Sequence, residues 1–242
     1  MKTLSLLLLS SALVALPAHA VTVASWDFTA ASGQLNDTSG NGHNLTNGGN
    51  VTFSTSTGAD FDGTNAGDLQ GAYNASIEPG SIGAGQVWSI EVTGVVLDAT
   101  NSFRTVYSSR SANGYGTVIY RYNSAWQFWT GKGVTPDTDK WNVVSVAAPS
   151  GEQTLTASWD GTTMSLTADN GTTSVSNSGT PTTVGFNDGS KNFAFGNGGN
   201  SISEFFLDGR IKTATIAVVP EPSTTGLLAF AGLALAFKRR RL

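Results

Sequence analysis

The sequence predicts an all-β protein built as a two-sheet antiparallel sandwich. Three observations predict this fold: apolar residues alternate with polar ones over short segments, clusters of Gly, Asn and Asp separate these segments, and residues 21–219 contain no convincing helical periodicity. Many short strands without a fixed internal period favour a sandwich over a repeat solenoid or a propeller.

The N-terminus has the three parts of an export signal. Lys2 supplies a positive start, Leu4–Leu16 an apolar run, and Ala18-His19-Ala20 a small-residue cleavage site. We therefore expect residues 1–20 to be a signal peptide and Val21 to begin the mature chain. An uncleaved anchor is the alternative, although the apolar run is short for a membrane span.

The clearest strands show strict alternation. In Trp88–Thr93 every second residue is apolar, and Leu155, Ala157 and Trp159 repeat the pattern. Asp160-Gly161 follows at once and alternation then resumes, which predicts a hairpin over Gln153–Ala168 with its turn at Asp160–Thr163. The further expected strands are Val21–Phe28, Val51–Phe53, Arg104–Ser108, Thr117–Tyr122, Trp126–Thr130, Asn142–Ala148, Asn192–Phe195 and Arg210–Val218.

Composition limits what the region between the termini can be. Residues 21–218 are enough for one all-β domain with a sizeable core. The chain has 13 basic and 17 acidic residues; without Lys2, the last four cations and Glu221, 8 and 16 remain, a net charge of −8. Duplex nucleic acid is therefore not an expected partner. The absence of cysteine excludes disulfides and thiolate metal sites.

The C-terminus, residues 219–242, has a rigid motif, a short apolar run and a basic end. Pro220 and Pro222 flank Glu221, and Ser223–Phe237 follows before four consecutive cations. As a helix these 15 residues span about 22 Å, short of the roughly 30 Å bilayer core, so crossing requires local thinning or support from the flanks. The cations resist translocation and hold this end in the cytoplasm.

This order of parts closely resembles the PEP-CTERM sorting signal of Gram-negative bacteria. The resemblance implies that Pro220, Glu221 and Pro222 form the sorting motif and that an exosortase, a membrane-embedded protease, recognises and processes the tail. It implies a transient stay in the inner membrane, followed by the cell surface or the extracellular matrix. An ordinary single-span anchor is the alternative.

Several segments together resemble a laminin-G-like, concanavalin A-like jelly roll. They are Trp26-Asp27-Phe28 with the Asn36–Gly42 loop, Asp60–Gly63, the hairpin at Trp159-Asp160-Gly161, and Phe206–Ile211. They occur in the expected order and cover nearly all of residues 21–218. Each segment is short and rich in turn residues, so the series carries the resemblance.

One segment has the oxygen ligands that suit a hard cation. The Asp37–Gly42 loop combines a carboxylate, hydroxyls and amide oxygens, a set that suits Ca²⁺. The resemblance to laminin-G-like domains, which often bind calcium, implies Asp37 and Asn41 as ligands, with Asp208 (or Asp27 or Asp62) completing the shell if the first and last strands adjoin. The alternative is that these residues only make tight turns.

The stretch from Tyr115 to Trp129 is a candidate ligand surface. Strand alternation places Tyr120 and Tyr122 on one face of their strand and Arg121 on the other. In the next strand it places Trp126 and Phe128 on one face and Gln127 and Trp129 on the other. Aromatic rings stack on the apolar faces of sugars, so we select Tyr120, Arg121 and Trp129 as candidate polysaccharide-binding residues. The alternative is that all these rings pack between the sheets.

Catalysis is not expected. Jelly rolls include glycan hydrolases and lyases, yet none of Glu78, Glu91, Glu152 and Glu204 has the spacing of a catalytic carboxylate pair, and His43 is the one histidine after residue 20. We expect an exported, non-enzymatic protein that contacts carbohydrate or mediates adhesion in an exopolysaccharide biofilm. A glycan-active enzyme and a purely structural matrix protein are the alternatives.

Overall fold

The computed structural model describes residues 20–64, 67–72, 86–98, 103–111, 114–133, 140–186, 192–198 and 206–219. These residues belong to one compact unit, Ala20–Pro220. They form sixteen strands and no helix, which confirms the all-β prediction. Within these ranges, no helix has the length and hydropathy needed to cross a membrane. The expected signal peptide (residues 1–20, described only at Ala20) and the sorting tail (described only at Val219) lie outside the described residues.

The larger sheet has nine strands, all paired antiparallel. Its order is β13-β12-β11-β6-β15-β4-β3, and β16 pairs with the first half of β6 on the same edge as β15, with β1 beyond it. Its strands are β1 (Val21–Asp27), β3 (Thr52–Ser54), β4 (Gly58–Asp62), β6 (Val87–Leu97), β11 (Gln153–Trp159), β12 (Met164–Asp169), β13 (Ser174–Gly179), β15 (Asp208–Ile211) and β16 (Thr213–Val219).

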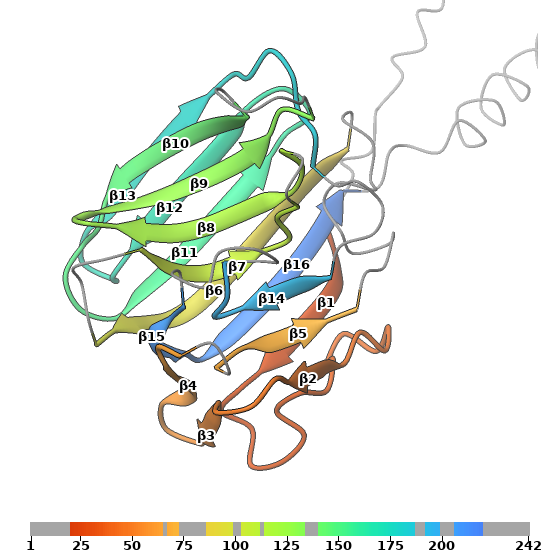
Figure 1. Cartoon of the computed structure of the whole chain (residues 1–242), viewed down its shortest axis with the longest axis vertical. Coiled ribbons are helices and arrows are strands. Elements are labelled where there is room, and N and C mark those ends of the chain that lie inside the picture. The colour runs from red at the N-terminus through yellow and green to blue at the C-terminus, as the bar shows by residue number, and fades with distance from the viewer. Residues whose placement is uncertain are drawn as a thin grey trace, which may run out of the picture. The chain divides into compact units, whose positions relative to one another are not determined.

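The smaller sheet has seven strands in the order β10-β9-β8-β7-β14-β5-β2, also antiparallel. In Figure 1 the green strands β8, β9 and β10 lie in front of β11, β12 and β13 of the larger sheet. Its strands are β2 (Leu45–Asn47), β5 (Leu69–Gly71), β7 (Arg104–Ser108), β8 (Thr117–Tyr122), β9 (Ala125–Gly131), β10 (Trp141–Ala147) and β14 (Phe193–Phe195).

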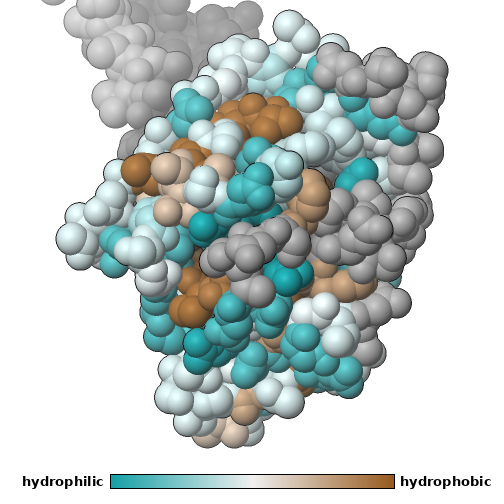
Figure 2. Space-filling model, turned by 60° about the vertical axis from the view of Figure 1, so that its left-hand side comes forward, coloured by the Kyte–Doolittle hydropathy of each residue, from teal (hydrophilic) through white to brown (hydrophobic). Residues whose placement is uncertain are grey.

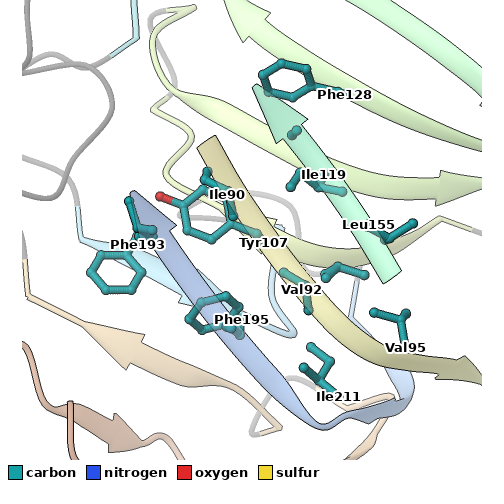
Figure 3. Close-up of a cluster of buried hydrophobic side chains, with 14 of the residues drawn as sticks. Ile90, Val92, Val95, Tyr107, Ile119, Phe128, Leu155, Phe193, Phe195 and Ile211 are labelled. Atoms are coloured by element: carbon teal, nitrogen blue, oxygen red, sulfur yellow. The ribbon is translucent and has the colours of Figure 1, made fainter. Parts of the chain in front are cut away.

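The core fills the space between the two sheets. Trp88 of the larger sheet meets Phe128 of the smaller one edge-on, with ring centroids 5.9 Å apart. Figure 3 shows side chains from β6 and β11 converging with those from β7, β8 and β14. Two polar contacts also join the sheets inside this core: the Trp126 indole N–H donates to the Gln153 side-chain oxygen at 2.6 Å, and the Thr130 hydroxyl donates to the Met164 sulfur at 3.7 Å. The alternating residues of both sheets thus supply one shared apolar layer.

Most expected strands coincide with observed ones. Arg104–Ser108 and Thr117–Tyr122 match β7 and β8, and β11 and β12 form the expected hairpin, in which the Asp160 N–H donates to the Thr163 carbonyl. The single strand expected over Arg210–Val218 is wrong, because the chain divides there into β15 and β16 at Lys212. Four further strands, β2, β4, β5 and β13, were not among the expected strands; they are short or mostly polar.

Candidate functional site

The two sheets present different outer faces. On the larger sheet most outward side chains are small and hydroxylated, and several of them bond to one another across strands. Thr93 and Thr213 hydroxyls lie 2.7 Å apart, and those of Thr167 and Ser176 lie 3.1 Å apart. Because these hydroxyl groups are paired with each other, the short side chains form a polar surface of low relief.

The smaller sheet carries a continuous run of rings on its outer side. We call Phe103, Tyr120, Tyr122, Trp129 and Trp141 the aromatic face. Phe103 stacks on Tyr122 with ring centroids 4.4 Å apart, and it lies 5.6 Å from Tyr120. Tyr120 meets Trp129 at 5.3 Å, and Trp129 meets Trp141 at 5.8 Å. Rings in mutual contact therefore extend across four neighbouring strands, from β7 to β10.

Strand alternation and register produce this arrangement. In β9, Trp126 and Phe128 are buried in the core, so Gln127 and Trp129 point to the other side. Tyr120 pairs with Gln127 across the ladder, which places it diagonally beside Trp129. Tyr122 is 41% exposed, whereas Tyr120 beneath its neighbours is 7% exposed. Figure 2 shows one side of the molecule, where hydrophobic residues gather in separate brown patches among hydrophilic ones.

A pocket opens on the aromatic face. Its volume is about 210 Å³. It is lined by Phe103, Thr105, Arg110, Val118, Tyr120, Trp129 and Gly198. Pockets for drug-sized ligands are larger, roughly 300–1,000 Å³, so this one suits a single small group such as one sugar ring.

Arg110 gives the pocket its charge. The guanidinium carbon lies 5.0 Å from the centre of the Trp141 ring, in the geometry of a cation–π contact. Burial lowers the pKa of Arg110, and burial likewise raises the pKa of Tyr120 above its ordinary value, partly offset by the nearby Arg110 charge. At neutral pH the pocket therefore combines a cation, a neutral phenol hydroxyl and apolar ring faces.

The structure brings together two of the three expected ligand residues. Tyr120 and Trp129 are neighbours on the aromatic face, but Arg121 lies on the opposite side of β8. Its guanidinium stacks over the core residue Trp126 at 5.5 Å and donates to the Asn123 carbonyl at 2.7 Å. Arg121 thus has a packing role at the edge of the core.

Sequence reasoning missed Phe103, Trp141 and Arg110. Phe103 and Trp141 each directly precede an expected strand, Arg104–Ser108 and Asn142–Ala148, and both lie outside the aromatic stretch Tyr115–Trp129. Their position beside neighbouring strands was the signal that the sequence offered. Arg110 lies after β7, where no periodicity indicates the direction of its side chain.

The loop expected to bind calcium is held by its own hydrogen bonds. Both carboxylate oxygens of Asp37 accept from donors: the N–H groups of Ser25, Ser39 and His43 and the Ser39 hydroxyl, at 2.8–3.0 Å. The Asn41 amide N–H donates to the Val23 carbonyl at 2.9 Å. The Asp37 carboxylate thus already has four hydrogen-bond donors around it, and calcium binding at this loop stays a prediction.

Asp208, the third expected calcium ligand, has other neighbours. It pairs with Asp62 across β15 and β4, and its carboxylate lies 3.7 Å from the Arg104 guanidinium. Among the described residues, no group of three or more His, Cys, Asp or Glu could hold a metal ion. The observed contacts thus give Asp37 and Asp208 separate structural roles.

The glutamates considered for catalysis and the sorting residues fall in two groups, those that the structure describes and those that it does not. Glu91 is exposed on the outer face of the larger sheet, and Glu152 forms an ion pair with Lys212 at 2.7 Å. Glu78, Glu204 and the sorting residues Pro220, Glu221 and Pro222 lie outside the described residues.

Comparison with protein families confirms the sorting signal. Residues 218–241 match the PEP-CTERM protein-sorting motif. The motif implies a secreted chain that is transiently anchored in the membrane and processed by an exosortase before surface export. No curated protein matches the sequence of this chain.

Solved structures with a similar fold include three toxin domains. They are the binding domain of botulinum neurotoxin serotype D (16% identity, TM-score 0.59), the receptor binding domain of a botulinum neurotoxin C/D mosaic serotype (14%, 0.60) and the binding domain of Paraclostridial Mosquitocidal Protein 1 (13%, 0.58). They cover 88%, 88% and 86% of this chain and 51% of each of those chains, so this chain spans about half their length. At these identities the similarity shows the fold alone, a jelly-roll-like β-sandwich.

Proposed function

We propose that this protein is an exported matrix protein whose laminin-G-like jelly roll binds polysaccharide through the aromatic face. The PEP-CTERM motif at residues 218–241 supports export and exosortase processing. The exported protein would then be surrounded by matrix polysaccharide, and its proposed role is adhesion within that matrix.

The observation that carries the proposal is the unbroken contact among five rings on one outer face. Aromatic side chains on a protein surface supply large, rigid contact area at low entropic cost, with a polar edge on Tyr and Trp for hydrogen bonds. A pyranose ring has an apolar face and a rim of hydroxyls, and the pocket beside Tyr120 and Trp129 offers both kinds of partner. The hydroxyl-covered face of the larger sheet offers no such platform among the described residues.

Binding without catalysis is part of the proposal. The aromatic face joins rings and one guanidinium, and its described pocket lining contains no carboxylate for acid–base chemistry on a glycosidic bond. Release of reducing ends from a bound polysaccharide by the purified protein would contradict this part.

The test is binding by a Trp129→Ala variant. A glycan array identifies bound polysaccharides, and calorimetry compares affinities. We expect Trp129→Ala to weaken binding at least about tenfold, because loss of a ring contact of about 1.4 kcal/mol corresponds to that factor. The matched control is Thr156→Ala, on the outer face of the larger sheet, which should bind as the wild type does. Equal affinity of wild type and Trp129→Ala, with both variants folded by circular dichroism, would refute the proposal.

A further inference from the structure

The charges of the domain are divided between its two sheets. Every carboxylate that lies within a described strand belongs to the larger sheet: Asp27, Asp60, Asp62, Glu91, Asp169 and Asp208. The described strands of the smaller sheet contain no Asp or Glu, and their two charged residues are Arg104 and Arg121. The aromatic face is thus built on a sheet with a cationic balance, although the domain as a whole is acidic.

Arg110 differs from the other described arginines in having no hydrogen-bond acceptor for its guanidinium among the residues that the structure describes. Arg104 and Arg210 pair with Asp208 and Asp98 at 3.7 and 3.5 Å, and Arg121 donates to a backbone carbonyl. The guanidinium of Arg110 lies against Trp141 and lines the pocket, and within the described part of the chain no carboxylate lies within ion-pair distance of it. Its planar set of donors is therefore available at the pocket.

A half-buried cation without an anionic partner is costly unless something compensates it. Contact with Trp141 holds the guanidinium in place but satisfies none of its N–H groups. A carboxylate is the partner that a fixed guanidinium fork matches best, through two parallel hydrogen bonds. The pocket is small enough that such a carboxylate would belong to the same sugar ring that contacts Trp129.

We propose that the aromatic face is selective for acidic polysaccharide, with the carboxylate of a uronic-acid residue bound by Arg110 and its ring stacked on Trp129. This inference rests on the proposed function and adds the substrate class. The net charge of the domain does not oppose it: the Debye length is about 8 Å at physiological salt, so carboxylates on the far sheet are largely screened from the pocket.

The experiment compares acidic polymers with their neutral counterparts. The purified full chain is titrated with polygalacturonate, alginate and hyaluronate, and with each polymer after reduction of its carboxyl groups. We expect the wild type to bind at least one acidic polymer at least about tenfold more tightly than its reduced form, because a hydrogen bond to a charged group is worth roughly that factor. Added salt should weaken the acidic complex and leave any neutral one unchanged.

Two substitutions locate the effect. Arg110→Gln should lose the preference for the acidic form while retaining the weaker binding of the reduced form, and Arg110→Lys should recover part of the preference. Arg121→Gln is the matched control, because it removes the same charge on the other side of β8 and should keep the full preference.

The outcomes separate the two proposals. Equal binding of acidic and reduced polymers, or a preference that survives Arg110→Gln, would overturn the acidic-sugar inference and leave carbohydrate binding standing. Binding of none of the polymers, together with a blank glycan array, would overturn both.

Discussion

At the scale of single residues, one short pattern organises many of the turns. An aspartate at the end of a strand accepts hydrogen bonds from the N–H and the hydroxyl of a threonine two positions later. Asp27 with Thr29, Asp62 with Thr64, and Asp160 with Thr162 make the same pair of bonds at 2.6–2.9 Å. Because these bonds are local, the turn after Trp159 could be predicted from sequence.

Asp37 extends this pattern to a longer loop, and its substitution is the first prediction. Asp37→Ala removes the acceptor of four hydrogen bonds, one from Ser25 of β1 and three from Ser39 and His43 within the loop. We expect the free energy of unfolding at pH 7 to fall by about 1–3 kcal/mol, measured by urea denaturation. Asp60→Ala, an exposed carboxylate on β4, is the charge-matched control and should cost about 0.5 kcal/mol or less.

The same residue gives the acid dependence of stability its sign. Burial alone would raise the pKa of Asp37, but hydrogen bonds from Ser25, Ser39 and His43 outweigh it and hold the pKa below 3.8. The folded chain therefore binds this proton less readily than the unfolded chain. The stabilisation is complete above pH 3.8 and is lost as the pH falls through the lower folded value. An Asp37→Ala variant as acid-sensitive as the wild type would contradict this account.

The candidate site shows where sequence reasoning stops at this scale. Alternation correctly opposed Tyr120 to Arg121 and Trp126 to Trp129. Alternation alone could not show that Tyr120 and Trp129 lie on the same face of the sheet, since that depends on the register between β8 and β9. It also gave no direction for Arg110, which follows a strand and is oriented by contact with Trp141 from β10.

At the scale of elements, a kink shared by β6 and the β15–β16 segment divides the larger sheet. Gly94 has a φ of +67°, and Lys212 lies directly opposite, donating its N–H to the Thr93 carbonyl at 2.9 Å. Beyond this point β6 exchanges its neighbour β16 for β15. Opposite β11 the register of β6 shifts between Val92 and Val95, an irregularity of the β-bulge kind that bends a strand. On the other edge, β15 and β16 continue in one register along β6.

Gly94→Ala tests this kink. Alanine is strained in the left-handed backbone conformation of this position, and its Cβ would collide with the Lys212 side chain. We therefore expect the free energy of unfolding to fall by about 2–4 kcal/mol. Gly171→Ala is the matched control, because its φ is +79° but nothing lies near the added atom; it should cost about 1 kcal/mol. Equal losses in thermal unfolding would show that the Lys212 contact is unimportant.

Elements with strong local signals were predictable and the others were not. The β11–β12 hairpin combines strict alternation with an Asp-Gly turn, so its strands and turn were expected. Strand β13 contains one partly buried apolar residue, Val175, and owes its place to pairing with β12. The division at Lys212 depends on Gly94, more than a hundred residues earlier, and no local pattern reports such a contact.

At the scale of the whole molecule, the two faces of the sandwich have different chemistry. The larger sheet holds the strand carboxylates and an outer layer of paired hydroxyls, and the smaller sheet holds the rings and a guanidinium without a carboxylate partner among the described residues. A purely structural sandwich has no need of such a division. The PEP-CTERM motif adds that the chain is secreted and transiently anchored in the membrane before surface export.

The sorting motif gives a prediction about the entire chain. Replacing Pro220, Glu221 and Pro222 with alanine should leave the protein in the inner membrane, because the extended motif that an exosortase recognises is lost. Fractionation with immunoblotting measures the distribution. Pro181→Ala, which changes a proline far from the tail, should be released as the wild type is. Normal release of the triple variant would contradict exosortase processing.

The most direct test of the central claim is a crystal structure of the protein with an oligosaccharide identified by the glycan array. The account predicts a sugar ring lying against Trp129, with its neighbours on Trp141 or Tyr120 and any carboxylate at Arg110. Density for the sugar on the hydroxyl-covered face of the larger sheet, or at the Asp37 loop, with the aromatic face bare, would contradict it.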